Sequence, residues 1–166
     1  MTMRNLLEMI HEYQLLVSKR DHLGVPLTED EQVRVLGLSQ LLAVEGDARG
    51  RAMMNVSLPP SVVFTMPGGF EMGQVKNISG RGLAIATSHP ADVDTRTVVR
   101  IVDAANGCEY LFPCRVVWRR RNPLPGMGVA FDGVPTRTKW APDDETTGIW
   151  RRSPLAGAGS KAVQAA

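Results

Sequence analysis

Apolar and polar side chains alternate in a series of short segments between residues 61 and 132 of this 166-residue chain. A period of two places successive side chains on opposite faces and is typical of β-strands that bury one face. Glycine, proline, serine and asparagine separate the segments, and no helical periodicity lies between them. The sequence predicts six strands, at residues 61–66, 72–78, 82–88, 97–103, 108–120 and 127–132. Short strands at this spacing form an antiparallel barrel or sandwich, and six of them favour a small closed barrel.

The fifth and sixth segments show which side chains are expected to share one face of a strand. In CEYLFPCRVVWRR, one face carries Tyr110, Phe112, Cys114, Val116 and Trp118. In GMGVAF, Met127, Val129 and Phe131 share one face, and the other face carries only glycine and alanine. The alternation therefore predicts that the members of each set point to the same side of their strand.

Two amphipathic helices are predicted before the first strand. Residues 3–22 carry apolar side chains at intervals of three and four, which form one stripe of a helix. A second helix extends from Thr28 to about Glu45 and opens with TEDE, where Thr28 and Glu31 match a capping box. The short connection makes a helical hairpin, and its apolar stripes must be buried. Packing against the same chain, dimerisation and docking of a partner protein all satisfy this requirement.

These patterns divide the chain into three predicted parts. An N-terminal helical hairpin covers residues 1–46, a β-barrel covers residues 47–136, and a polar extension covers residues 137–166. The end of the extension, SPLAGAGSKAVQAA, has few large apolar side chains, so we expect it to be disordered. The predicted fold class is mainly β, with a six-stranded antiparallel barrel after the helical hairpin.

Composition and motifs argue against several classes of protein. The net charge of +2 is too small for a general polyanion binder, and no apolar run approaches the roughly 18 residues of a membrane span. Charged residues interrupt the N-terminal apolar stretch, so we expect no signal peptide and place the chain and its two cysteines in the reducing cytoplasm. No nucleophile, phosphate-loop or zinc-protease motif is present, and neither cysteine has metal-ligand spacing. We expect no enzymatic activity, no metal and no cofactor.

A polar turn joins the second and third predicted strands within QVKNISGRGLAIAT. The amide of Asn77 and the hydroxyl of Ser79 can meet the edge of a guanine if the turn presents them to a ligand. Gly82 permits either a backbone angle or a close approach that a Cβ would block. Asparagine and serine also close turns by bonding to their own backbone, so the residues alone leave both roles open.

The same segment, with YLFPCRVVWRR and GMGVAFDG after it, resembles the PilZ domain over about residues 49–135. The motif [D/N]-x-S-x-x-G of that family is matched by Asn77, Ser79 and Gly82. The resemblance implies a six-stranded barrel that serves bacterial signalling, typically as a receptor for the dinucleotide cyclic di-GMP. It implies a ligand role for these three residues.

The second half-site of the family is an R-x-x-x-R arm before the first strand, whose guanidinium groups hold the phosphates of the ligand. The stretch ARGRAMMN supplies Arg49 and Arg51, which the resemblance adds to the ligand residues. Met53 and Asn55 stand four residues after Arg49 and Arg51, so the R-x-x-x-R spacing is absent. If Arg51 aligns with the first arginine of the motif, Asn55 replaces the second. Because asparagine cannot neutralise a phosphate, this degenerate arm predicts weak or absent binding of cyclic di-GMP.

Three functions follow as hypotheses. The first is a bacterial signalling adaptor that acts through protein contacts, with the helical hairpin as its docking element or as the interface of a homodimer. The resemblance makes motility, pili or envelope polysaccharide the processes under control. The second is a functional cyclic di-GMP receptor. The third is a barrel that binds nucleic acid through Arg115, Arg119, Arg120 and Arg121, against which the small net charge and the few nearby aromatic residues argue.

Overall fold

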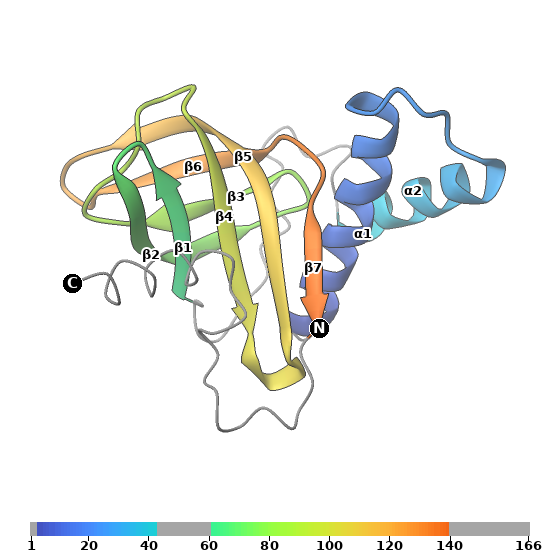
Figure 1. The fold of residues 1–166 in the computed structure, drawn as a ribbon, viewed down its shortest axis with the longest axis horizontal. Coiled ribbons are helices and arrows are strands. Elements are labelled where there is room, and N and C mark those ends of the chain that lie inside the picture. The colour runs from blue at the N-terminus through green and yellow to red at the C-terminus, as the bar shows by residue number, and fades with distance from the viewer. Residues whose placement is uncertain (1–2, 43–60, 140–166) are drawn as a thin grey trace, which may run out of the picture.

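Seven antiparallel strands in one closed sheet form the body of the protein (Figure 1). The computed structural model describes residues 3–42 and 61–139, so the sequence-based predictions for Arg49, Arg51, Asn55 and the C-terminal tail concern residues outside the described ones. The strands are β1 (Ser61–Met66), β2 (Gly69–Ile78), β3 (Gly82–Ala86), β4 (Arg96–Asp103), β5 (Cys108–Arg120), β6 (Gly126–Phe131) and β7 (Thr136–Lys139). A short 3-10 turn, η1 (Ala104–Asn106), joins β4 to β5.

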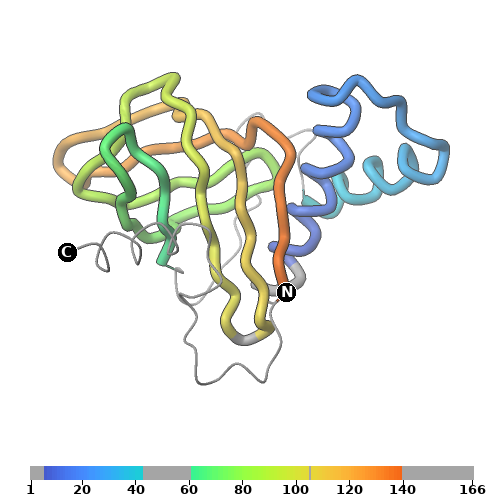
Figure 2. The backbone as a smooth tube through the Cα atoms, viewed as in Figure 1, coloured from blue at the N-terminus to red at the C-terminus, as the bar shows by residue number. Residues whose placement is uncertain are grey.

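The strand order closes the sheet into a barrel. Neighbouring strands follow the order β4-β1-β2-β3-β6-β5, and β5 pairs back onto β4. The chain can be followed around this ring in Figure 2. The predicted six-stranded antiparallel barrel is therefore confirmed.

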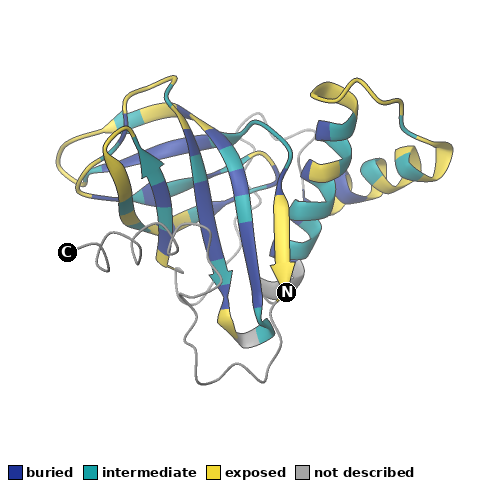
Figure 3. Ribbon diagram, in the orientation of Figure 1, coloured by how far each residue is buried: buried dark blue, intermediate teal, exposed yellow. Residues whose placement is uncertain are grey.

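β7 is an additional strand that the sequence did not predict. It pairs with the first part of β5, where Cys108 lies opposite Lys139 and Leu111 lies opposite Thr136. Its four residues, TRTK, are all exposed (Figure 3). A strand without buried side chains has no apolar alternation, which is the signal on which the sequence-based prediction depended.

The core fills the inside of the barrel, and the inward faces are those of alternate residues. The predicted shared face of β5 is confirmed for Tyr110, Phe112, Cys114 and Val116, which are all buried. Met127 and Val129 of β6 are buried as well, and Phe131 packs against the core. Trp118 is the exception, since 42 % of it is exposed.

The exposure of Trp118 results from a β-bulge. The register between β5 and β6 shifts between Val116 and Trp118, so that Val117 is an extra residue on β5. An inserted residue reverses the alternation beyond it. Trp118 therefore lies on the outer face of the barrel, and its predicted place on the same face as Val116 is wrong.

Helix α1 (Met3–Asp21) packs against the barrel, which confirms that the hairpin buries part of its apolar surface on its own chain. Leu6, Leu7 and Ile10 belong to the same buried cluster as the strands. The ring of His11 meets Tyr110 edge-on, with 5.8 Å between ring centroids. In Figure 1, α1 stands beside β7 at one side of the barrel. No helix among the described residues is long and apolar enough to span a membrane.

Helix α2 (Glu29–Leu41) begins with the predicted capping box, in which the Thr28 and Glu31 side chains each accept a hydrogen bond from the other residue's backbone. Leu38 and Leu42 on its inner side are buried. Leu41 is 62 % exposed, and Val33 and Leu36 are exposed as well.

Candidate functional site

The turn between β2 and β3 is closed by its own polar groups. The Ser79 backbone N–H donates to the carbonyl of Gly82 at 2.9 Å. The Arg81 backbone N–H donates to the hydroxyl oxygen of Ser79 at 3.2 Å. The hydroxyl of Ser79 thus helps to close the turn, which is one of the two roles that the sequence left open. Its oxygen keeps the capacity to accept a further hydrogen bond.

Asn77 is placed on the outer face by a second β-bulge. The register between β2 and β3 shifts between Val75 and Asn77, which leaves Lys76 as the extra residue. Val75 and Ile78 consequently both point inward and are buried, while Asn77 points outward and is half-buried. Among the described residues, the Asn77 side chain has no hydrogen-bond partner, so its amide can bond outward.

Gly82 of β3 lies close against the backbone of β6. A Cβ at this residue would lie 2.0 Å from the carbonyl oxygen of Val129 and 3.0 Å from the Cα of Ala130. Both atoms belong to the backbone of β6, which cannot move aside as a flexible side chain can. Gly82 therefore meets the expectation of a contact that tolerates no Cβ, and the cause is the close approach of two strands.

One row of paired residues crosses four strands on the outer face, from Asn77 to Trp118. Asn77 lies opposite Ala84, Ala84 opposite Gly128, and Gly128 opposite Trp118. The indole of Trp118 covers Gly128, because a Cβ there would lie 2.0 Å from the indole Nε1. With strands about 4.8 Å apart, the three spacings make a floor roughly 14 Å wide.

Two parallel rows extend this floor. One passes through Gly82 and Ala130 to Arg115, and the other passes from Gln74 through Ala86 and Gly126 to Arg120. The outer side of the β3–β6 pair therefore carries only glycine and alanine. We call the whole surface the ligand face, which comprises Asn77, Ser79, Gly82, Ala84, Ala86, Arg115, Trp118, Arg120, Gly126, Gly128 and Ala130.

The ligand face combines three kinds of chemistry. Its floor is flat and apolar because no side chain larger than a methyl group rises from β3 or β6. Asn77 and Ser79 offer hydrogen bonds along the β2 edge, and Trp118 offers an aromatic surface on β5. Arg115 and Arg120 place positive charge on either side of the indole. Such a surface suits a ligand with flat heteroaromatic rings and phosphate groups.

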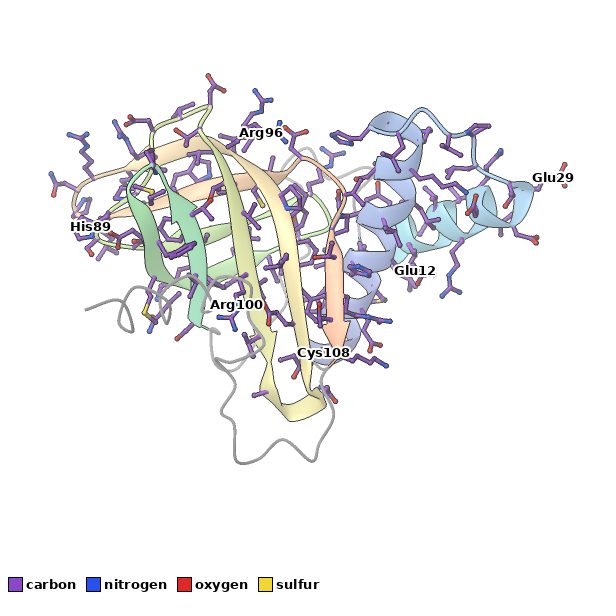
Figure 4. All side chains as sticks on the ribbon, in the orientation of Figure 1. Glu12, Glu29, His89, Arg96, Arg100 and Cys108 are labelled. Atoms are coloured by element: carbon purple, nitrogen blue, oxygen red, sulfur yellow. The ribbon has the colours of Figure 1, made fainter. Side chains whose placement is uncertain are left out.

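Arg115 is one of three basic groups around Asp132, the residue that follows β6. Its Nε lies 3.2 Å from Asp132 Oδ2, and Nη1 of Arg96, which stands at the start of β4 in Figure 4, lies 2.9 Å from the same oxygen. The hydrogen bond from His22, supported by Arg115 and Arg96, lowers the pKa of the Asp132 carboxyl. Arg115 is still 45 % exposed, so part of its guanidinium group faces solvent.

Two of the other three arginines that the sequence groups with Arg115 have different surroundings. Arg119 pairs with Asp92 of the loop before β4, while Arg120 donates to the carbonyl of Leu124 at 2.8 Å. Of the four arginines that the sequence groups together, Arg115 and Arg120 face the same side as Trp118 by their register with β6. The run of arginines in the sequence could not show which of them face the same side as Trp118.

The structure brings together Asn77, Ser79 and Gly82, the three predicted site residues among those it describes. Reasoning from the sequence missed Trp118 and the small-residue floor as parts of the site. The alternation GMGVAF did mark the floor, but the bulge that turns Trp118 onto it left no signal in the pattern. Within the described ranges, no cluster of histidine, cysteine or acidic side chains could hold a metal. Cys108 and Cys114 are buried free thiols.

Comparison with known proteins agrees with the sequence resemblance. The family model of the PilZ domain matches residues 47–140, which is more than half of the chain. The match covers the whole barrel, β7 and the ligand face, and it excludes both helices. No curated protein matches the chain.

Proposed function

This chain belongs to the PilZ domain family, and we propose that it is a signalling adaptor that acts through protein contacts and binds cyclic di-GMP weakly or not at all. PilZ domains are binding and adaptor domains of cyclic di-GMP signalling and are not enzymes. The finer assignment of this chain within that class depends on its arm, its ligand face and its helical hairpin.

The observation that carries the proposal is the contrast between the turn and the arm. Asn77, Ser79 and Gly82 keep the family motif on a well-formed turn, whereas Asn55 replaces an arginine of the arm. A charge-assisted hydrogen bond to a phosphate contributes roughly 1.5–3 kcal/mol. Its loss lowers affinity on the order of ten- to a hundredfold. We expect a dissociation constant for cyclic di-GMP no tighter than roughly tens of micromolar.

The helical hairpin supports the adaptor role. α2 exposes Val33, Leu36 and Leu41 on the side that does not contact the barrel core. Two ion pairs hold α2 onto α1, Lys19 with Glu31 at 2.7 Å and Arg34 with Glu12 at 2.5 Å. Exposed apolar side chains on a braced helix are suited to a protein partner, or to a second copy of the chain.

Isothermal calorimetry with the full chain tests the proposal. We expect weak or undetectable heat from cyclic di-GMP for the native chain, and tighter binding by Asn55→Arg. Arg51→Ala in the Asn55→Arg background should weaken that binding again. Sub-micromolar binding by the native chain that Arg51→Ala abolishes would refute the adaptor proposal. Failure of Asn55→Arg to bind would show that the turn itself has no ligand function.

The alternative of a functional cyclic di-GMP receptor has one specific observation in its favour. The β5 edge of the ligand face supplies two guanidinium groups and an indole, at Arg115, Arg120 and Trp118. These side chains can contribute the phosphate contacts that Asn55 does not make. If this alternative holds, Arg115→Ala and Arg120→Ala will each weaken binding by the native chain, and Arg121→Ala will not.

Partner docking has its own test. Leu36→Asp should abolish association with a partner or with a second copy, while Val93→Asp, at a similarly exposed apolar side chain in the loop before β4, should not. Light scattering of the purified chain measures the homodimer, and affinity capture followed by the same two variants measures a partner. Association that both variants retain would contradict the role of α2. Motility, pili and envelope polysaccharide are the processes in which we would seek a phenotype.

A further inference from the structure

A polar stripe lies along the side of α1 that faces two loops of the barrel. Gln14, Ser18 and His22 follow one another at intervals of four, so they share one side of the helix and of the turn that ends it. Gln14 and Ser18 are 8 % and 1 % exposed, on the helix whose Leu6, Leu7 and Ile10 pack into the apolar core. Buried polar side chains are costly unless they are hydrogen-bonded.

Each residue of this stripe bonds to a barrel loop. The side-chain amide of Gln14 donates from Nε2 to the carbonyl of Gly80 at 2.6 Å. The hydroxyl of Ser18 donates to the carbonyl of Gly133 at 2.7 Å. His22 Nε2 lies 2.9 Å from Asp132 Oδ1. All three contacts join positions far apart in the sequence, so each one fixes the helix against the barrel.

The loops that α1 contacts are those that border the ligand face. Gly80 is inside the turn that bears Ser79 and Gly82, and Asp132 holds Arg115 at the other edge. The two loops are also joined to each other, because the Phe131 backbone N–H donates to the carbonyl of Arg81 at 2.8 Å. α1 therefore lies across both loops and holds them together.

We infer that Gln14 is a positioning residue of the ligand turn and that it couples the ligand face to the helical hairpin. Gly80 is buried, and Gln14 is the side chain that satisfies its carbonyl. Without this bond the turn would keep its internal hydrogen bonds but lose this hydrogen bond to the helix. The residue lies outside the part of the chain that the PilZ model matches, so the site includes an element that the family match does not cover.

The coupling extends from the turn to α2. Glu12 points from α1 toward α2 in Figure 4 and pairs with Arg34, and Lys19 pairs with Glu31. A ligand that favours the held form of the turn must also favour the docked form of α1. If the ligand changes the affinity of the hairpin for a partner by some factor, then binding of that partner changes the affinity of the ligand face for the ligand by the same factor. This regulatory consequence rests on the proposed function, whereas the positioning of the turn does not.

Amide hydrogen exchange of the full chain without ligand tests the positioning directly. The backbone N–H groups of Ser79 and Phe131 report on the turn and on its junction with β6. In Gln14→Met, which keeps the length of the side chain and removes the donor, we expect both to exchange at least about fivefold faster. Amides of β4 should keep their rates. Gln40→Met, on the exposed side of α2, is the matched control and should change neither set.

A second variant keeps the test decisive if Gln14→Met fails to fold. Gln14→Asn keeps the amide but moves it one methylene away from Gly80, and the same local acceleration is expected. Unchanged exchange at Ser79 and Phe131 in either folded variant would overturn the inference. Equal acceleration of the turn and of β4 in both variants would also overturn it, because Gln14 would then serve global stability alone.

Titration with cyclic di-GMP separates this inference from the proposed function. The Asn55→Arg background is used, because tighter binding is expected there. Gln14→Met should weaken that binding about fivefold or more, and saturating ligand should slow exchange of α1 amides at residues 10–18. Equal affinity with and without Gln14→Met would overturn the coupling. If the Asn55→Arg background binds no ligand, the ligand role of the turn fails, and the ligand-free exchange rates alone decide whether Gln14 positions it.

Discussion

Asn77 and Trp118 stand at opposite ends of one row of paired residues, and a β-bulge places each of them there. Lys76 is the extra residue beside Asn77, and Val117 is the extra residue beside Trp118. In regular strands both side chains would point into the core. The two bulges instead turn an amide and an indole onto the same outer surface, with only Ala84 and Gly128 between them. Bulges are frequent beside functional sites because they re-aim side chains in this way.

The contact at Gly82 predicts a large loss of stability on substitution. Gly82→Ala would bring a methyl group 2.0 Å from the carbonyl oxygen of Val129, so β3 and β6 would have to separate. We expect the free energy of unfolding to fall by about 2–4 kcal/mol, with a larger loss for Gly82→Val. A methyl group at Gly68 would meet no atom within 4 Å, so Gly68→Ala is the control. Similar chemical denaturation midpoints for the two alanine variants would contradict this account.

Packing of α1 on the barrel predicts that the helix is part of the folded unit. Ile10 is buried in the common core, and Ile10→Ala should reduce the free energy of unfolding by about 2–4 kcal/mol. Leu15→Ala on the exposed side of the same helix should cost less than about 1 kcal/mol. Urea denaturation followed by circular dichroism measures both. If Ile10→Ala were as stable as Leu15→Ala, the helix would not share the core of the barrel.

The hydroxyl of Tyr110 is a buried polar group without a hydrogen-bond partner among the described residues. Burial is the main reason that the pKa of Tyr110 is raised to about 12. Tyr110→Phe keeps the ring contacts with His11 and Phe112 and removes the unpaired hydroxyl. We expect unchanged stability or a gain of up to about 1 kcal/mol. Tyr110→Ala, which removes the ring as well, should lose about 3–5 kcal/mol. A comparable loss in Tyr110→Phe would show that the hydroxyl is bonded.

His11 predicts a dependence of stability on pH. Burial, followed by the positive charge of Arg137, lowers the pKa of His11 from its ordinary value of 6.5. The unfolded chain then binds a proton at this residue more readily than the folded chain does. The contribution of neutral His11 to the free energy of unfolding is therefore fully present above pH 6.5. It is lost as the pH falls from 6.5 through the lowered pKa of His11 in the folded state.

Thermal unfolding between about pH 5 and pH 7 measures this effect. The melting temperature of the native chain should fall as the pH is lowered through this range, and His11→Gln should flatten the slope. His89→Gln, at an exposed loop residue, should retain the slope of the native chain. A slope that His11→Gln leaves intact would assign the dependence to another group.

Regular structure was predictable from the sequence where one face is buried. The bounds of β1 and β5 agree with the predicted segments, and the capping box fixed the start of α2 at Thr28. Period-two alternation could not reveal the bulges. Val117 and Trp118 are both apolar, and Lys76 and Asn77 are both polar, so the pattern does not show which residue is extra. That is why Trp118 was placed on the wrong face. β7 escaped prediction since all four of its side chains are exposed.

The candidate site was predictable in its turn and less so in its surroundings. The motif located Asn77, Ser79 and Gly82, whose spacing within one turn keeps them together in any fold of the segment. The bond between Gln14 and Gly80 joins two elements 66 residues apart, and nothing in an amphipathic helix pattern indicates the partner of one polar side chain. Contacts of this kind depend on the docking of a whole helix, which the three-dimensional structure supplies.

The indole of Trp118 gives the last prediction, which concerns where a ligand lies. If cyclic di-GMP occupies the ligand face, a guanine ring can stack on Trp118 above the Gly128 floor, and such stacking is worth roughly 1–3 kcal/mol. Trp118→Ala in the Asn55→Arg background should therefore weaken binding roughly 5- to 150-fold. Val117→Ala removes the neighbouring exposed side chain of the bulge and should have little effect. With Trp140 and Trp150 replaced by phenylalanine, quenching of the remaining tryptophan fluorescence should follow the calorimetric binding curve. Binding that neither quenches Trp118 nor depends on it would place the ligand elsewhere on the barrel.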